Sequence, residues 1–451
     1  MERVDYMYQN KKIFVLGMAR SGYEVSKFLS NYNNQILVTD GKEQDENHVQ
    51  ELKSLGVEII ISNEPENLLD NSFDVVVKNP GIKYTHPVIT KAKELNIPVI
   101  NELEVAYSFL DKSVKIIGVT GSNGKTTTVT LIDKFLNVEL DNVYLCGNIG
   151  YPVTSIINKV KPNDILVIEI SDHQLCDMYN FKTNISVLTN ISETHIDFHD
   201  SYDRYKMMKK RIFNNHTDKD LAILNYDNAE VMKLTEDIKS NKYYFSKDNK
   251  LTSYIKDDAI YYNDELVVKL DDIKIKGMHN YENIMAAIIV AKEFNISNTS
   301  IVNVLKEFKG VEHRIEYVDT INNRKFYNDS KSTNNIATIT ALQAFKEPTT
   351  LLMGGLDRNI PFADISPYLG NVKMIEAFGE TKEKVKEFAT NNNIECHIFD
   401  TLREVTIDAY QNSSDGEVIL LSPACASWDQ YEKFEDRGNE FKEIVNEIKM
   451  S

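Results

Sequence analysis

The sequence is poor in cysteine, and this excludes several classes of protein. Its 451 residues include only Cys146, Cys176, Cys396 and Cys425, and none of them forms a CxxC pair. Such sparse cysteines exclude a disulfide scaffold and a cysteine-based zinc cluster. We expect free thiols in a reducing compartment.

The chain also lacks long apolar runs and an excess of basic residues. Its longest apolar stretches have the length of strands, far short of the roughly 20 residues that span a membrane. The opening MERVDYMYQNKK lacks the apolar core of a signal peptide. A formal net charge of -17 disfavours nucleic acid or an anionic membrane as the main partner. We therefore expect a monomeric, cytoplasmic protein that acts on small molecules.

Apolar runs of strand length alternate with helical patterns along the chain. This alternation predicts an α/β fold with mostly parallel sheets. Domains usually contain roughly 100–200 residues, so the length favours three, which we place at 1–107, 108–311 and 312–451. Strands are expected at 12–16, 35–39, 57–61, 73–77, 114–119, 165–170, 185–188, 221–224, 326–327, 350–353, 374–378 and 418–421. The Tyr-rich, turn-interrupted residues 241–276 predict a small antiparallel element.

The strongest functional signal is a glycine-rich loop between a strand and a helix. An apolar run ending near Val119 leads into Gly121-Ser-Asn-Gly124-Lys125-Thr126. Glycines let backbone N–H groups turn toward phosphate oxygens, while lysine reaches the terminal phosphates and the threonine hydroxyl can bind Mg²⁺. The usual pattern has glycine where Val119 stands, and Gly121 supplies the flexibility instead. The loop predicts ATP binding.

Candidate metal ligands follow the loop. Glu169 ends an apolar run, and the carboxyl end of a parallel strand beside a phosphate loop suits a Mg²⁺ ligand. His195 follows another strand, although a single histidine also fits a structural role. Asp172 and His173 fit a solvated turn. Lys209 borders the apolar stripe of a helix expected over 201–213, where the pattern alone favours a solvated lysine.

Together, five motifs resemble the Mur ligase superfamily in both order and spacing. They are Thr120-Gly-Ser-Asn-Gly-Lys-Thr126, Gly147-Asn148-Ile-Gly150, Glu169-Ile-Ser171, Asn190-Ile-Ser-Glu-Thr-His195-Ile-Asp197 and Gly277-Met-His-Asn280-Tyr-Glu-Asn283. The resemblance implies a Rossmann-like domain that binds a UDP-linked substrate, a central ATPase domain with a phosphate loop, and a Rossmann-like C-terminal domain.

Further motifs in the last third resemble the superfamily member that adds D-glutamate. They are Asn328-Asp-Ser-Lys-Ser-Thr-Asn334, Gly354-Gly-Leu-Asp-Arg358, Ser422-Pro-Ala-Cys-Ala-Ser-Trp-Asp-Gln430 and Phe434-Glu-Asp-Arg-Gly-Asn-Glu-Phe441. This resemblance implies ATP-dependent amide bond formation between UDP-N-acetylmuramoyl-L-alanine and D-glutamate, through an acyl phosphate, in peptidoglycan synthesis. The Asp-Asn-Pro-Arg stretch of the diamino-acid-adding member is absent.

The resemblance also implies roles for the nucleotide and metal ligands. Lys125, His195 and Lys209 match catalytic positions, and Lys209 matches a lysine that CO₂ converts to a carbamate. Two Mg²⁺ ions are implied, with ligands at Thr126, Glu169, His195 and Lys209. The implied ATP contacts are Gly121, Ser122, Asn123, Gly124, Lys125, Thr126, Thr127, Asn280, Asn283, Arg314 and Asp329.

The remaining implied contacts hold the two other substrates. Those for the UDP-linked substrate are Arg20, Ser21, Asp40, Lys42, Asn79, Asn148, Ser171 and Gln174, and His195 also matches a contact to its muramoyl-alanine end. Those for D-glutamate are Lys331, Thr333, Arg358, Ser427 and Phe434. Arg358 stands where some relatives have lysine, and a guanidinium binds carboxylates differently from an ammonium. Trp428, the only tryptophan, fits a packing residue at the pocket edge.

Other functions fit parts of the sequence. Another Mur ligase or a folylpolyglutamate synthase would share the phosphate loop but not the C-terminal motifs. An NAD-linked oxidoreductase could use Asp40 for a ribose contact. However, Ala19 replaces the middle glycine of that fingerprint, and Lys125 would remain unexplained. A non-catalytic nucleotide switch would leave the carboxylate-binding residues without a role.

Overall fold

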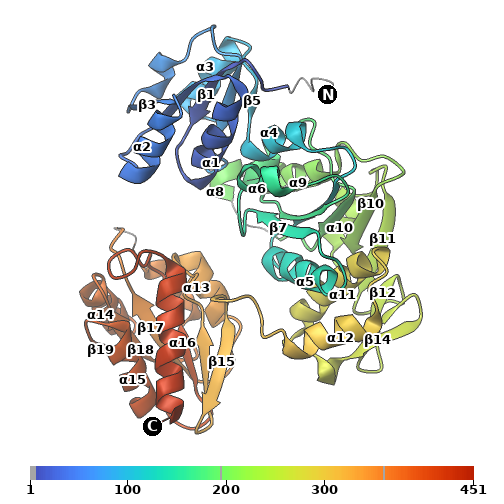
Figure 1. The fold of residues 1–451 in the computed structure, drawn as a ribbon. Coiled ribbons are helices and arrows are strands. Elements are labelled where there is room, and N and C mark those ends of the chain that lie inside the picture. Colours follow the sequence, from blue (N-terminus) through green and yellow to red (C-terminus); the bar gives the residue numbers. More distant parts are fainter. Residues whose placement is uncertain (1–6, 193–195, 359–360, 451) are drawn as a thin grey trace. The chain divides into compact units, whose positions relative to one another are not determined.

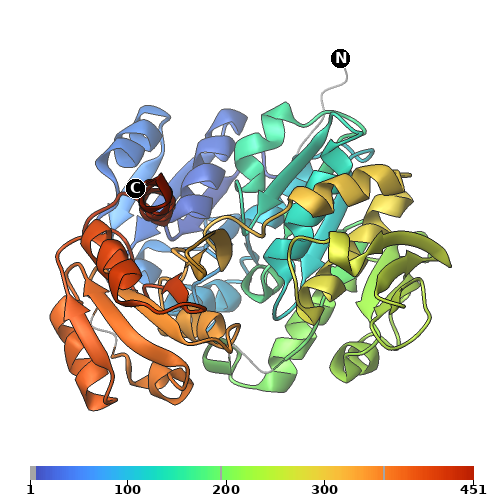
Figure 2. The same ribbon diagram turned by 90° about the horizontal axis from the view of Figure 1, so that it is seen from below.

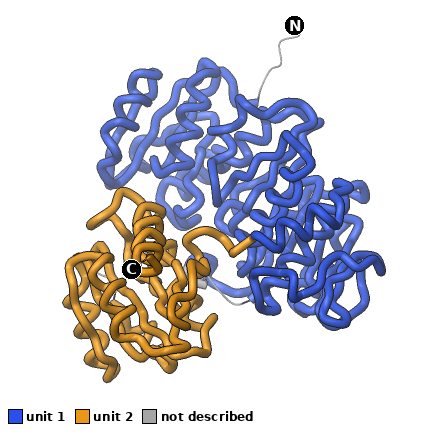
Figure 3. The backbone as a smooth tube through the Cα atoms, turned by 60° about the horizontal axis from the view of Figure 1, so that its bottom comes forward, with its two compact units in different colours: residues 1–307 blue, residues 308–451 orange. Residues whose placement is uncertain are grey.

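The computed structural model describes residues 7–192, 196–358 and 361–450. The chain divides into two compact units, residues Met1–Glu307 and Phe308–Ser451 (Figure 3). Each unit is built from mostly parallel sheets covered by helices, so the predicted α/β class is confirmed. The division into domains at 107/108 and 311/312 stays a prediction.

The first sheet is entirely parallel, with strand order β3-β2-β1-β4-β5. Its strands are the short apolar runs seen in the sequence, and the central ones are buried on both faces. The strands are β1 (Lys12–Leu16), β2 (Gln35–Asp40), β3 (Glu58–Ile61), β4 (Val75–Lys78) and β5 (Val99–Ile100). The helices are α1 (Arg20–Leu29), α2 (Glu46–Ser54), α3 (Pro87–Glu94) and α4 (Glu102–Phe109).

The second sheet has nine strands in the order β14-β13-β12-β11-β10-β9-β6-β8-β7. They are β6 (Lys115–Thr120), β7 (Val143–Gly147), β8 (Ile165–Glu169), β9 (Ile185–Leu188), β10 (Leu221–Asn225), β11 (Asn241–Ser246), β12 (Ser253–Lys256), β13 (Ala259–Tyr262) and β14 (Glu265–Lys269). The prediction of a small antiparallel element over 241–276 is confirmed for β12, β13 and β14 and wrong for β11. β11 and β12 extend the parallel sheet, and only β12, β13 and β14 pair antiparallel.

Eight helices of the first unit follow the strands of the second sheet. They are α5 (Lys125–Asn137), α6 (Val153–Ile156), α7 (Asp172–Leu175), α8 (Ile196–His199), α9 (Tyr202–Lys210), α10 (Ala229–Leu234), α11 (Met278–Glu293) and α12 (Asn298–Glu307). The long helix α11 packs beside α5 and against β10 to β12 (Figures 1 and 2). This packing brings α11 to the glycine-rich loop at the start of α5.

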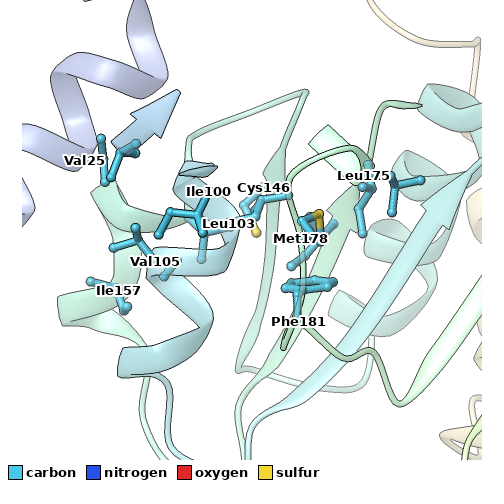
Figure 4. Close-up of a cluster of buried hydrophobic side chains, with 14 of the residues drawn as sticks. Val25, Ile100, Leu103, Val105, Cys146, Ile157, Leu175, Met178 and Phe181 are labelled. Carbon is cyan, nitrogen blue, oxygen red and sulfur yellow. The ribbon is translucent and has the colours of Figure 1, made fainter. Parts of the chain in front are cut away.

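One buried apolar cluster contains residues from both sheets of the first unit (Figure 4). Val25 of α1 and Leu103 of α4 belong to it together with Cys146 of β7, Met178 and Phe181. Burying an apolar side chain of this size contributes about 1.5–3 kcal/mol. The two sheets of this unit therefore share part of their core.

The second unit is a six-stranded sheet in the order β15-β16-β20-β17-β18-β19, parallel except for the β15–β16 pair. Its strands are β15 (Glu316–Ile321), β16 (Arg324–Asn328), β17 (Thr349–Gly354), β18 (Val372–Phe378), β19 (Glu395–Ile398) and β20 (Val418–Leu421). Its helices are α13 (Asn335–Leu342), α14 (Lys382–Asn391), α15 (Leu402–Asn412) and α16 (Phe434–Met450). Helices α15 and α16 pack together, and their apolar residues join those of the central strands in one cluster (Figure 1).

Across the described ranges, no helix combines the length and apolar character needed to cross a membrane. All four cysteines are free thiols, as the sequence predicts.

Candidate active site

The glycine-rich loop joins β6 to α5 in a conformation that requires glycine at two positions. Gly121 has a φ of 151° and Gly124 a φ of 82°. A Cβ on Gly124 would lie 2.2 Å from Asn283 Oδ1, and one on Gly121 would lie 2.0 Å from Thr189 Oγ1. Both substitutions would therefore force neighbouring groups apart. Asn283, a predicted nucleotide contact, is buried against this loop.

Neighbouring polar groups hold the loop in place. The Asn123 backbone N–H donates to Asn190 Oδ1 at 3.0 Å, and Asn190 Nδ2 donates back to the Asn123 carbonyl at 3.0 Å. Ser122 Oγ lies 2.7 Å from the Tyr205 hydroxyl of α9. Lys125 Nζ donates to the carbonyls of Gly121 and Ser122 at 2.8 and 2.9 Å. The lysine is thus folded over the same loop that the motif predicts to bind phosphates.

Two predicted metal ligands, Thr126 at the start of α5 and Glu169 at the end of β8, are in contact. β8 pairs with β6, with Glu169 opposite Val119. Thr126 Oγ1 donates to Glu169 Oε2 at 2.7 Å, and Asn148 Nδ2 donates to Glu169 Oε1 at 2.7 Å. A hydroxyl and a carboxylate oxygen at hydrogen-bond distance are the hard ligands that Mg²⁺ prefers. The donor set present here therefore fits a magnesium ion bound beside the loop.

Lys209 is fully buried, which contradicts the pattern-based expectation of a solvated lysine. Its Nζ donates to Asp172 Oδ1 at 3.1 Å and lies 4.9 Å from the centre of the Tyr205 ring. Burial lowers the pKa of Lys209 to about 7, and the charge of Lys125 lowers it further against the opposing effects of Asp172 and Glu169. A substantial fraction of this amine is therefore neutral near pH 7.

Three residues around Lys209 were missed as site residues. Asp172 is buried, not part of a solvated turn, and its Oδ2 lies 2.7 Å from His199 Nε2. Ser171 caps α7 by accepting from the Gln174 backbone, while the Gln174 side chain accepts from the Ser171 backbone. This capping box places Asp172 in the first turn. The sequence offered a signal for two of them, the proximity of Asp172 to Glu169 and the position of Tyr205 on the apolar stripe of the helix expected over 201–213, but none for His199.

The predicted UDP-substrate residues of the first sheet also lie together. They follow the carboxyl ends of β1, β2 and β4, which are neighbours in the sheet. Asp40 accepts from the backbone N–H groups of Met18 and Lys42 at 2.8 and 3.1 Å, and Asn79 Nδ2 donates to Ser21 Oγ at 3.3 Å. The Arg20 guanidinium lies 5.5 Å from the Tyr151 ring centre. A cavity of about 390 Å³ lined by Lys11, Asp74 and Pro98 lies near the amino ends of these strands and contains none of the predicted site residues.

In the second unit, Asp329 is buried after the end of β16. It accepts from Ser422 Oγ at 2.7 Å and from the Ile315 backbone N–H at 3.2 Å. Burial raises the pKa of Asp329 to about 6, although these hydrogen bonds and the nearby Arg314 oppose the shift. Lys331, two residues on, has its Nζ 5.8 Å from the centre of the Phe434 ring. Asp329, Lys331 and Phe434 are therefore close within this unit.

Arg437, which the sequence analysis did not select, connects the loops of the second unit. Its fully buried guanidinium donates to Ser330 Oγ at 3.0 Å, to the Ser330 carbonyl at 2.9 Å and to the Cys425 carbonyl at 3.1 Å. It also lies 3.5 Å from the Gly354 carbonyl. The segments that contain Ser330, Gly354 and Cys425 belong to the motifs predicted to bind D-glutamate. Arg437 therefore fixes the spacing between these segments.

Other predicted residues lie at more open positions. Thr127, Asn280 and Thr333 are partly exposed, and Arg358 and Lys42 are exposed. Ser427 is buried, and its Oγ has no hydrogen-bond partner within the described part of the chain. Trp428 is 65% exposed, so the prediction that it packs at a pocket edge is wrong. His195 lies outside the described residues.

Comparisons with known families match most of the first unit. Residues 119–291 match the family described as the Mur ligase middle domain. Residues 11–101 match the MurD-like N-terminal domain of Mur ligases. The two matches cover the first two sheets and the site beside the glycine-rich loop.

Curated relatives match along almost the whole chain. Proteins named UDP-N-acetylmuramoylalanine--D-glutamate ligase from Bacillus thuringiensis (strain Al Hakam) and Bacillus anthracis (strain A0248) are each 44% identical over 445 residues, 98% of both chains. Among solved structures, the UDP-N-acetylmuramate-alanine ligase MurC of Thermotoga maritima is 19% identical with a TM-score of 0.58, over 97% of this chain and 100% of that one. MurF of Acinetobacter baumannii is 15% identical with a TM-score of 0.58, over 91% and 92%. These structures support the fold.

Proposed function

The chain belongs to the Mur ligase family, and from that premise we propose that it joins D-glutamate to UDP-N-acetylmuramoyl-L-alanine with hydrolysis of ATP to ADP and phosphate. The relatives that carry this activity in their names align with 98% of the chain at 44% identity. The structural observation that carries the proposal is the meeting of the phosphate loop, Glu169 and the buried Lys209 in one region.

The proposed reaction has two steps. The alanine carboxylate attacks the γ-phosphorus of ATP, forming an acyl phosphate and releasing ADP. The amine of D-glutamate then attacks the acyl carbon, the amide forms as phosphate leaves, and the amine gives up a proton. Lys125 and the loop N–H groups would bind the phosphates and orient the γ-phosphoryl group. Activation by phosphate converts a poor leaving group into a good one.

Mg²⁺ would neutralise charge between the phosphates and the attacking carboxylate. Thr126 and Glu169 offer the oxygen ligands for it, and His195 stays a predicted ligand. We propose two such ions, since the resemblance implies a second ion held by a carbamate on Lys209. Before metal arrives, Thr126 and Asn148 orient the Glu169 carboxylate by hydrogen bonds to both of its oxygens.

The environment of Lys209 supports the carbamate. A neutral amine attacks CO₂, forms an N–C bond and releases one proton, whereas an ammonium cannot react. The lowered pKa of Lys209, about 7, makes the neutral form available. The product would place an anion near Lys125, and because Asp172 and Glu169 are also close it would need Mg²⁺ to neutralise its charge.

D-Glutamate carries two carboxylates, so its pocket needs cationic and polar donors. We propose that Lys331, Thr333, Arg358, Ser427 and Phe434 provide this pocket. Lys331 and Phe434 are close to each other, and Ser427 has a buried hydroxyl able to bond a ligand. The three-domain division, the monomeric state and the cytoplasmic location stay predictions.

The proposal is tested by phosphate release from ATP and Mg²⁺ with UDP-N-acetylmuramoyl-L-alanine and one amino acid. D-Glutamate should support release, whereas L-glutamate, lysine and D-alanine should not. No ADP with the D-glutamate mixture would refute the activity, and equal rates with L-glutamate would refute the substrate.

A separate experiment tests the carbamate. Protein equilibrated with ¹³C-bicarbonate at pH 8 should show a carbamate carbon resonance. The resonance should disappear in Lys209→Ala and persist in Lys206→Ala, a lysine on the same helix that contacts Glu230. A spectrum without the resonance in the unaltered protein would refute the modification.

A further inference from the structure

The second unit contains a cluster of two carboxylates and a histidine that the proposed reaction does not use. Glu376 lies on β18, His397 on β19 and Asp408 on α15. One potential ligand atom of each lies within 4.8 Å of the others. Its members are far in sequence from the residues predicted to bind D-glutamate.

The fold brings these three residues together in a defined way. β18 and β19 pair in parallel, with Glu376 directly opposite His397, so both side chains lie on the same face of the sheet. Helix α15 packs on β18 and supplies Asp408. His397 Nδ1 lies 2.6 Å from Asp408 Oδ2 and 3.5 Å from Glu376 Oε1. The same nitrogen therefore faces both carboxylates.

Glu376 gives an independent reason to expect a ligand. Its side chain is fully buried, and no N–H or O–H group of the described residues donates to either carboxylate oxygen, although the protonated form shares a hydrogen bond with Asp408. Its nearest cationic group is His397, at 3.5 Å. A buried carboxylate without hydrogen bonds is costly unless a proton or a metal ion neutralises it. Burial and the nearby Asp408 raise the pKa of Glu376 to about 9, so a metal ion would displace a proton.

We propose that Glu376, His397 and Asp408 bind a divalent transition-metal ion of the zinc type. One imidazole nitrogen and two carboxylate oxygens suit Zn²⁺ better than Mg²⁺, which prefers oxygen ligands alone. In a tetrahedral site with bonds of about 2.0–2.1 Å, ligand atoms lie about 3.3 Å apart. The distances from His397 Nδ1 to Asp408 Oδ2 (2.6 Å) and to Glu376 Oε1 (3.5 Å) lie on either side of that value. The His397 side chain is 32% exposed, so an ion can reach it from solvent.

A second feature supports the orientation of the histidine. His397 Nε2 lies 3.4 Å from Glu395 Oε1. Metal-bound histidines usually donate their other ring N–H to a carboxylate or carbonyl, which fixes the tautomer. A bound ion would link β18, the edge strand β19 and α15. It would therefore stabilise the edge of the sheet.

The test uses the full-length protein, stripped of metal and then held in excess Mg²⁺ and ADP to occupy the nucleotide site. Co²⁺ serves as the spectroscopic probe and Zn²⁺ as the competitor. We expect one equivalent of Co²⁺ to give the visible absorption of four-coordinate cobalt, and Zn²⁺ to remove that absorption. Zn²⁺ should also raise the Tm.

Matched variants locate the ion. Glu376→Gln, His397→Gln and Asp408→Asn should each weaken binding at least about 100-fold, and Glu395→Gln about tenfold. Glu447→Gln, an exposed carboxylate of the same unit paired with Arg403, should bind like the unaltered protein. If Glu376→Gln fails to fold, the partly exposed His397→Gln still decides the question. Absence of cobalt absorption, or absorption unchanged by these substitutions, would overturn the proposal.

Discussion

The first unit buries the cation of Lys209 and the second buries that of Arg437, and the two side chains have different partners. In the first unit, Lys209 has Asp172 as its acidic partner and the Tyr205 ring beside it. In the second, Arg437 donates to hydroxyl and carbonyl oxygens of separate loops. Burial lowers both pKa values, that of Lys209 to about 7 and that of Arg437 to about 10. The lysine can therefore lose its proton and react, whereas the arginine stays charged and holds structure.

The largest expected effect is on catalysis by the lysine. Lys209→Ala should lower the rate of phosphate release about 10³-fold, because the site loses the group that would become its anionic ligand. The free energy of unfolding should also fall, because Asp172 loses the cation it is paired with in the interior, so rates are compared at a temperature where both proteins are folded. A short carboxylate such as acetate should restore part of the rate.

The control for this substitution is Lys210→Ala. Lys210 is on the same helix but pairs with the exposed Asp237. It should retain full activity. If the Lys209→Ala enzyme is as active as the Lys210→Ala enzyme, Lys209 has no role in catalysis.

The next effect is on the stability of the second unit. Arg437→Met should lower the free energy of unfolding by about 3–5 kcal/mol, because the buried oxygens around it lose their donor. Arg437→Lys should recover only part of this, since an ammonium lacks the planar fork. Urea unfolding of the full-length protein measures both, with the exposed Arg403→Met as the control. If Arg437→Met unfolds like the control, Arg437 is not a structural cation.

A smaller effect is expected when the partner of the lysine is altered. Asp172→Asn keeps the size of the side chain but removes the charge that faces Lys209 and His199. Activity should fall about 10–100-fold, as is usual when a group that orients a ligand is changed. Measured with saturating substrates, the loss should appear in kcat. Unchanged kcat would show that Lys209 needs no such orientation.

The smallest effect is a pH dependence of stability. Lys209 has a pKa of about 7 when folded, against 10.5 as its ordinary value. Between these values the unfolded chain binds more protons, so stability should rise with pH by up to about 1.4 kcal/mol per unit. Arg437 contributes no slope from pH 7 to 9, because it stays charged in both states.

This slope is measured as the difference between the unaltered protein and Lys209→Met in CO₂-free buffers. The difference should grow in favour of the unaltered protein as pH rises from 7 to 9. A constant difference would mean that Lys209 keeps an ordinary pKa.

Local sequence patterns predicted the features that depend only on residues close to one another in the sequence. The glycine-rich loop and the apolar strands follow from short-range sequence, and the structure places both as expected. The burial of Lys209 could not be predicted in this way, because its partner Asp172 lies on α7, which is distant in sequence. Arg437 was missed for the same reason, since its partners come from separate loops.

Two predictions from local pattern were wrong in whole or in part. Residues 241–276 are short and Tyr-rich, but whether such strands pair parallel or antiparallel depends on the sheet they join, here through β10. Trp428 fitted a packing residue at the pocket edge, yet it is 65% exposed, on the loop whose Cys425 carbonyl accepts from Arg437.

The apolar cluster shared by the two sheets of the first unit has a consequence for engineering. Helix α4 packs against both α1 and α6, and its Leu103 and Val105 belong to the shared cluster, so α4 contributes to the core of both sheets. A chimera that exchanges the module of the first sheet by cutting before residue 102 would pack a foreign α1 against the retained α4 and α6. A chimera that takes α4, α6 and β7 from the same parent would keep the shared apolar cluster intact. We expect such chimeras to express in soluble form.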